Sequence, residues 1–152
     1  PNFIYKTKTQ EYKEKIQKEY SPIEEPERMP EPILTKEIKE EIKEIIYSWK
    51  DAWEKLELDK YISYYSPHFY AEYKKMDYYQ WREYKRKLFN KYSWCRIDIG
   101  HIYITPIDNN RIKATFYQKF EADGYSDKGI KILEFIKTPY GWKIISEDCK
   151  EY

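Results

Sequence analysis

The sequence predicts an α+β domain in which helices come first along the chain and strands come last. Apolar residues recur every three or four positions between residues 35 and 56, which is the period of a helix. From Trp94 onward the pattern is typical of strands, and turn-forming residues separate four such segments. Helices followed by strands favour packing of the helices on one face of the sheet. We therefore expect three helices packed on an antiparallel meander of four strands.

Length and charge exclude several classes of protein. With 152 residues the chain is long enough for one domain with a short appendage. Lys and Arg total 28 against 27 Asp and Glu, so the basic excess that binds a phosphate backbone is missing. No apolar run approaches the ~20 residues that span a bilayer, and no signal peptide is recognisable. We expect no nucleic-acid partner and no membrane span.

The first part of the chain predicts an extension outside the domain. Residues 1–20 are polar and helix-prone, and four prolines fall within residues 21–32. Proline fixes φ and removes a backbone donor, so this second stretch is expected to be an extended linker. The predicted boundary separates an N-terminal extension, residues 1–34, from the domain, residues 35–152.

Local signals mark the three helices. Thr35 is placed to cap a long helix, and Asp59 to cap a short one. Asp77 and Gln80 have the spacing of a capping box, which opens a third helix. The long helix presents one apolar face, formed by Ile38, Ile42, Ile45, Trp49, Ala52, Trp53 and Leu56.

The second half of the chain predicts four strands joined by short turns. Asn and Gly mark the turns, because these residues tolerate the backbone conformations that turns need. Short connections favour antiparallel neighbours, which makes the sheet a meander. The expected strands are residues 94–105, 111–122, 130–138 and 142–149, with turns at 108–110, 123–129 and 139–141.

Several motifs resemble a known family. They are Trp49-Lys50-Asp51-Ala52-Trp53, Phe116-Tyr117-Gln118-Lys119-Phe120, Lys131-Ile132-Leu133, and Trp142-Lys143-Ile144 with Glu147. Together they are similar to the C-terminal domain of bacterial cell-shape L,D-carboxypeptidases and related L,D-transpeptidase-type envelope proteins, over residues 36–149. The resemblance implies the nuclear transport factor 2-like cone fold with a curved sheet, and a place in the cell envelope or periplasm.

The cysteines do not reproduce the catalytic part of that family. Its catalytic domain uses a His-Gly segment and a Ser-x-Gly-Cys-Arg segment, whereas residues 93–96 lack the Gly and no His-Gly segment precedes them. The resemblance therefore implies the non-catalytic module, with no catalytic residue and no cofactor. Cys95 and Cys149 fall three strands apart in the expected sheet, too far for a disulfide, so free thiols are expected, and their spacing is not that of a metal site.

Strand alternation places two polar residues in an aromatic wall. Gln118 shares a strand face with Phe116, and Lys131 is expected on the same side of the sheet. Buried polar groups need partners, and we expect Glu147 to pair with Lys131, and Tyr64 or Tyr65 with Gln118. Two interpretations remain open: an internal network that holds the cone closed, or a ligand pocket. The candidate ligand-binding residues are Trp53, Tyr64, Tyr65, Phe69, Trp81, Phe116, Gln118, Lys131 and Glu147.

Three functions are compatible with the sequence. The first is a non-catalytic binding or accessory module of an envelope protein that recognises a peptidoglycan fragment, another glycan or a protein partner. The second is a small isomerase or dehydratase, which requires acid–base chemistry by His68, Tyr64, Glu147 or Asp123. The third is a dimerisation module whose open sheet face pairs with a second copy.

Overall fold

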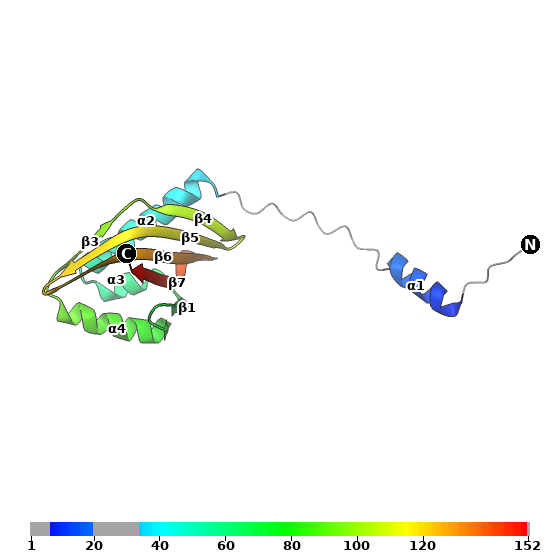
Figure 1. The fold of residues 1–152 in the computed structure, drawn as a ribbon, viewed down its shortest axis with the longest axis horizontal. Helices are drawn as coiled ribbons and strands as arrows, with labels where there is room; N and C mark the ends of the chain where they lie inside the picture. Colours follow the sequence, from blue (N-terminus) through cyan, green and yellow to red (C-terminus); the bar gives the residue numbers. More distant parts are fainter. Residues whose placement is uncertain (1–6, 20–33, 152) are drawn as a thin grey trace, which may run out of the picture. The chain divides into compact units, whose positions relative to one another are not determined.

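The structure, a computed structural model, describes residues 7–19 and 34–151. The chain divides into two units, Pro1–Glu31 and Pro32–Tyr152. In the first unit, helix α1 spans Lys8–Glu19 (Figure 1), which confirms the helix expected near the N-terminus.

The predicted linker cannot be compared with the structure. The Pro-rich stretch, residues 21–32, lies outside the described residues. The boundary between residues 34 and 35 stays a prediction.

Helix α2, Lys36–Glu54, begins where its cap was expected. The Thr35 side-chain oxygen accepts a hydrogen bond from the Ile38 backbone N–H at 3.1 Å, which satisfies one of the free donors at the helix start. Ile45 was expected on the apolar face of this helix, but it is only half-buried. Its neighbour Ile46 is fully buried and faces the core instead. The buried residues of the helix are Ile42, Ile46, Trp49, Ala52 and Trp53.

Helix α3, Leu58–Ile62, begins earlier than expected, so the predicted cap at Asp59 was wrong. Glu57, not Asp59, occupies the cap position, and its side chain makes no capping hydrogen bond. The chain turns at Leu56, whose φ of +56° is left-handed, so the helix starts before Asp59. The Asp59 carboxylate instead pairs with Arg82 at 3.2 Å.

Helix α4, Tyr78–Lys91, has the predicted capping box. The Gln80 backbone N–H donates to Asp77, the Asp77 backbone N–H donates to the Gln80 side chain, and both distances are 2.9 Å. Its buried face consists of Trp81, Lys85 and Phe89, which follow one another every four residues. This spacing places a lysine between two buried aromatic rings.

The sheet contains the expected meander and is wider than four strands. Three long antiparallel strands, β5 (Arg111–Ala122), β6 (Tyr125–Thr138) and β7 (Gly141–Glu151), pair side by side (Figure 1). The helices pack against this sheet, and the Phe116 ring of β5 lies 6.3 Å from the Trp49 ring of α2. Neighbours follow the order β2-β1-β7-β6-β5-β3, and β4 also pairs with β5. The strands are β1 Tyr65–Ala71, β2 Met76–Asp77, β3 Cys95–Ile99, β4 Tyr103–Asp108, β5 Arg111–Ala122, β6 Tyr125–Thr138 and β7 Gly141–Glu151.

Two expectations about the strands were wrong. The segment 94–105 forms two strands, because the chain leaves the ladder after Ile99 and rejoins β5 at Tyr103. Strand β1 was not expected to join the meander, yet it pairs in parallel with β7, as in Tyr70 opposite Ser146. The sheet is therefore mixed, although its long strands are antiparallel as predicted.

The hairpin between β5 and β6 is tighter than expected. The turn was assigned to residues 123–129, but pairing continues to Ala122 opposite Tyr125, and only Asp123 and Gly124 lie between the strands. Gly124 has a φ of +75°, a left-handed conformation that glycine adopts at no steric cost. As a result, Asp127 belongs to a paired strand and not to a loop.

Gly129 is a position where a side chain has no room. A Cβ added there would lie 2.6 Å from the Lys150 backbone oxygen and 3.2 Å from Cys149 Sγ, on the neighbouring strand. We expect Gly129→Ala to destabilise the domain by about 1–3 kcal/mol, since the backbone of β7 must move. Urea unfolding measures this change, and Gly124→Asn at the open hairpin turn, where Asn tolerates a positive φ, is the control. An unchanged midpoint for Gly129→Ala would contradict the close packing of β6 against β7.

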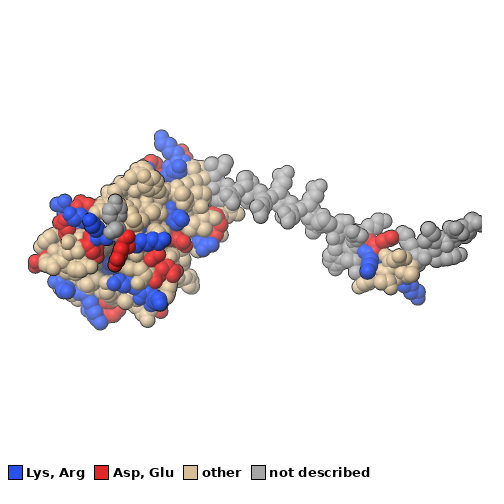
Figure 2. All heavy atoms as spheres, in the orientation of Figure 1, with Lys and Arg blue, Asp and Glu red and all other residues tan. Residues whose placement is uncertain are grey.

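The surface of the domain carries charges of both signs. Figure 2 shows Lys and Arg interspersed with Asp and Glu over the visible face, without a continuous basic stripe. This agrees with the net charge of +1. Within the described ranges, no helix has the combined length and apolar character needed to cross a bilayer.

Candidate functional site

A cavity of about 320 Å³ lies between helix α4 and the helix-facing side of strands β5 and β6. Trp53 of α2 and Lys85 of α4 contribute to one wall, and Gln118 and Lys131 to the strand wall. Tyr125 and Asp127, on the hairpin described above, also line it. Its volume is at the lower end of the range for small-molecule sites.

Three of the nine candidate ligand-binding residues line this cavity, namely Trp53, Gln118 and Lys131. The others do not line it, and all but the half-buried Tyr64 are buried in the core. Ligand binding by any of the nine stays a prediction. The six that lie outside the lining are Tyr64, Tyr65, Phe69, Trp81, Phe116 and Glu147.

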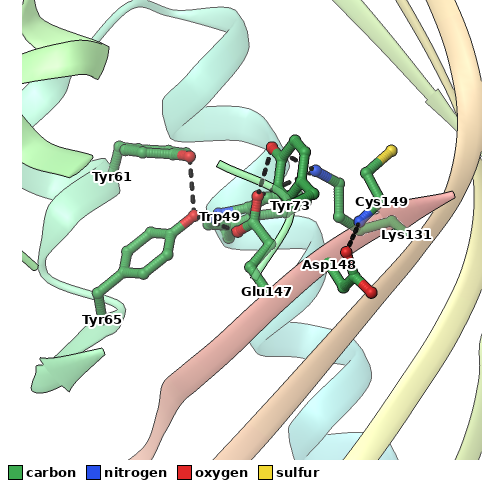
Figure 3. A network of polar contacts seen from close by, with 8 residues as sticks. All are labelled: Trp49, Tyr61, Tyr65, Tyr73, Lys131, Glu147, Asp148 and Cys149. Carbon is green, nitrogen blue, oxygen red and sulfur yellow. Dashed lines mark hydrogen bonds and ion pairs between the residues drawn. The ribbon is translucent and has the colours of Figure 1, made fainter. Parts of the chain in front are cut away.

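Lys131 and Glu147 form a buried ion pair, as expected. The Lys131 ammonium donates to Glu147 Oε2 at 2.9 Å, and the two side chains are 2% and 0% exposed. Figure 3 shows Tyr73 beside both groups, and its hydroxyl lies 3.4 Å from each. Burial lowers the pKa of Lys131, but the charge of Glu147, the hydrogen bond to it and the nearby Tyr73 and Cys149 together outweigh burial and hold the pKa above its ordinary value. Lys131 is therefore a charged, paired group at neutral pH.

The second Glu147 oxygen connects this pair to the helices. The Tyr65 hydroxyl donates to Glu147 Oε1 at 2.8 Å and accepts from the Trp49 indole N–H at 2.9 Å. Because Tyr65 gives its one proton to Glu147, the Tyr61 hydroxyl at 2.7 Å must donate to Tyr65. Burial and the Glu147 charge raise the pKa of both tyrosines, which keeps them protonated. For Glu147 and Tyr65, the interpretation as an internal network describes the geometry well (Figure 3).

Gln118 does not have the partner that was expected. The Tyr65 hydroxyl is committed to Glu147, and Gln118 Oε1 has no hydrogen-bond partner among the described residues. The side chain is 5% exposed and lines the cavity. A buried acceptor without a partner costs about 1–3 kcal/mol, so this group is suited to receive a donor from a bound molecule.

Lys85 is the feature of the cavity that the sequence analysis missed. Its side chain is 4% exposed, and its ammonium nitrogen lies 4.2 Å from the centre of the Trp53 ring and 4.9 Å from that of Trp81. Burial lowers the pKa of Lys85 to about 7, since the nearby charge of Lys131 adds to the desolvation and that of Glu147 offsets only part of it. The available signal was its position four residues after Trp81 and four before Phe89, on the buried face of α4.

The residues weighed for acid–base catalysis are not gathered at the cavity. His68 and Asp123 are exposed, and neither they nor Glu147 line it. Burial raises the pKa of Cys95 to about 11, so this cysteine is a neutral thiol. Both cysteines are free, on strands β3 and β7, three positions apart in the sheet. In the part of the chain that the structure describes, no three His, Cys, Asp or Glu side chains group as metal ligands do.

Comparison with solved structures identifies similar domains. Bd1075 from Bdellovibrio bacteriovorus is 26% identical with a TM-score of 0.70, and the match covers 76% of this chain and 41% of that one. A variant of the helical cell shape determining protein Pgp2 from Campylobacter jejuni is 26% identical with a TM-score of 0.62, covering 68% and 37%. The chain thus corresponds to about two fifths of each of these proteins. An NTF2-like protein of unknown function from Pseudomonas putida, 10% identical with a TM-score of 0.67 over 76% and 87%, shares the fold.

Family membership follows from the sequence match. No curated protein matches the chain. The family model for the Cds6 C-terminal NTF2-like domain matches residues 41–148, which is most of the domain. The α+β fold class and the resemblance to a nuclear transport factor 2-like C-terminal domain are therefore confirmed. The chain belongs to the family of Cds6 C-terminal NTF2-like domains.

Proposed function

We propose that this domain is a non-catalytic binding module of a bacterial cell-envelope protein, and that the cavity holds a peptidoglycan-related fragment. The observation that carries the proposal is the buried acceptor Gln118 Oε1, which has no partner among the described residues and belongs to the cavity wall. Gln118 lines the cavity together with the aromatic residues Trp53 and Phe120. Such a setting is typical of ligand sites, in which a few polar groups in an apolar wall fix the orientation of the ligand.

The envelope context comes from the relatives. One of the matched structures is a helical cell shape determining protein, and the match covers 37% of its length. The resemblance to C-terminal domains of cell-shape L,D-carboxypeptidases supports the same context. A module of this kind would hold wall material for a catalytic domain elsewhere in its protein.

Binding of soluble muropeptides to the full chain tests this function. We expect Gln118→Leu to weaken muropeptide binding by roughly 10- to 100-fold, because the ligand donor loses its acceptor. The stability of the variant should stay the same or rise slightly, since a buried amide without a partner is replaced by an apolar side chain. Isothermal titration calorimetry and urea unfolding measure the two effects.

The control is Thr115→Val, on the opposite face of the same strand, β5. It should bind muropeptides as the unaltered chain does. If the unaltered chain does not bind muropeptides, the proposed function is wrong. If Gln118→Leu binds normally and unfolds more easily, Gln118 is a structural residue instead.

A further inference from the structure

We propose that Lys85 is the receptor for an anionic group of the ligand, and that the ligand is a short peptide with a free carboxylate and not a neutral glycan. This inference rests on the proposed binding function of the cavity and names the chemistry that the cavity selects.

Lys85 is enclosed by rings and not by carboxylates. Its nitrogen lies within 4.2–6.0 Å of the ring centres of Trp53, Trp81, Tyr61 and Tyr84, and no ion pair involves it among the described residues. Aromatic faces attract a cation but carry no net charge, so they replace only part of the lost hydration. The open direction for a counter-charge is the cavity, which Lys85 lines.

None of the charged groups near Lys85 forms an ion pair with it among the described residues. Glu147 of β7 is paired with Lys131 of β6. Asp127 of β6 accepts a hydrogen bond from the Tyr125 hydroxyl at 2.8 Å and acts on Lys85 only through its charge. Cys95 of β3 is a neutral thiol, because its pKa is raised to about 11. Lys131 repels a second cation. A negative charge from outside the domain is therefore the missing partner of Lys85.

The cavity wall also requires the ligand to carry a hydrogen-bond donor. Gln118 Oε1 needs an N–H or O–H donor, while Lys85 needs an anion, and both belong to one cavity of about 320 Å³. The terminal residue of a peptide carries a carboxylate and a backbone N–H within a few ångströms of each other. A neutral sugar supplies hydroxyl groups and leaves the Lys85 charge without a partner. The need for both an anion and a nearby donor therefore favours the C-terminal residue of a peptide.

Binding of such a ligand must also move a proton. In the free domain, burial lowers the pKa of Lys85 to about 7, so above neutral pH much of the amine is uncharged. An adjacent carboxylate favours the ammonium form and raises that pKa. The complex therefore takes up a proton when it forms at pH 8, and takes up much less at pH 6, where Lys85 is already charged.

The experiment uses the full chain and defined probes. The probes are N-acetyl-alanyl-alanine, the same dipeptide as its C-terminal amide, N,N′-diacetylchitobiose and inorganic phosphate. Affinities come from NMR titration, and proton uptake comes from calorimetry in two buffers that differ in ionisation enthalpy. We expect the free acid to bind at least 10-fold more tightly than the amide, the sugar and the phosphate.

Variants assign the effect to Lys85. Lys85→Met should weaken binding of the free acid at least 10-fold and abolish the proton uptake. Lys85→Arg should keep more of the affinity but show no uptake, because Arg stays charged at both pH values. Lys87→Met, an exposed position on the same helix, is the control and should behave as the unaltered chain does.

The outcomes separate this inference from the proposed function. Equal binding of acid and amide, or normal binding by Lys85→Met, overturns the role of Lys85. Tighter binding of chitobiose or phosphate than of the dipeptide overturns the peptide assignment, while muropeptide binding would still support the module. If muropeptides and all four probes fail to bind the full chain, both proposals are wrong.

Discussion

Lys131→Met is expected to destabilise the domain by about 3–5 kcal/mol, because it leaves the Glu147 carboxylate buried without its counter-charge. In a domain of this size the loss lowers Tm by roughly 10–25 °C. The hydroxyls of Tyr65 and Tyr73 stay near the carboxylate, but they supply hydrogen bonds and no positive charge. Urea unfolding and differential scanning calorimetry measure the change.

A double variant separates the lost charge from the lost packing. Lys131→Met combined with Glu147→Gln removes both charges, so it should recover a large part of the stability that the single variant loses. Lys137→Met, at an exposed position of the same strand β6, should change stability by less than about 0.5 kcal/mol. A single Lys131 variant as stable as the Lys137 variant would show that the ion pair is not a structural element of the cone.

Lys85→Met is expected to have the opposite effect and to stabilise the free domain. The pKa of Lys85 is about 7 in the folded chain and 10.5 as its ordinary value, so the unfolded chain binds more protons between these pH values. Stability therefore rises with pH across this window, and at pH 7 and below the buried lysine costs about 2–5 kcal/mol. Replacing it with an apolar side chain of similar length removes the cost and flattens the pH dependence.

The measurement is urea unfolding of both proteins at pH 6, 7, 8 and 9. The stability difference between Lys85→Met and the unaltered chain should be largest at pH 6 and should shrink toward pH 9. Lys87→Met, which is exposed, should show no pH-dependent difference. Lower stability of Lys85→Met at every pH would mean that the ammonium and the rings form a net stabilising contact.

Signals that act over a few residues predicted the helices well. Thr35 and the pair Asp77–Gln80 cap α2 and α4 as expected, because a cap depends on side chains within four positions of each other. The Lys131–Glu147 pair was also predicted, since strand alternation fixes which residues share a face. The cap at Asp59 failed because the turn at Leu56 shifted the start of α3.

Features that depend on distant parts of the chain were missed. The parallel pairing of β1 with β7 joins residues 76 to 79 positions apart, as in Tyr70 opposite Ser146, and no local pattern encodes it. The tight hairpin at Gly124 was missed because the residues after it are polar and resemble a loop. These residues pair with β5 but not with β7. Lys85 was not among the candidate site residues, because a buried lysine without a carboxylate partner is rare.

If the cavity between α4 and strands β5 and β6 is a ligand site, an NMR titration of the isotope-labelled full chain with muropeptides will report it residue by residue. We expect shifts of the Trp53 indole signal and of the backbone amides of Gln118 and Asp127, with saturation at increasing ligand. Shifts confined to the solvent-facing side of the sheet, around Thr115 and Ile132, or no shifts at all, would contradict it.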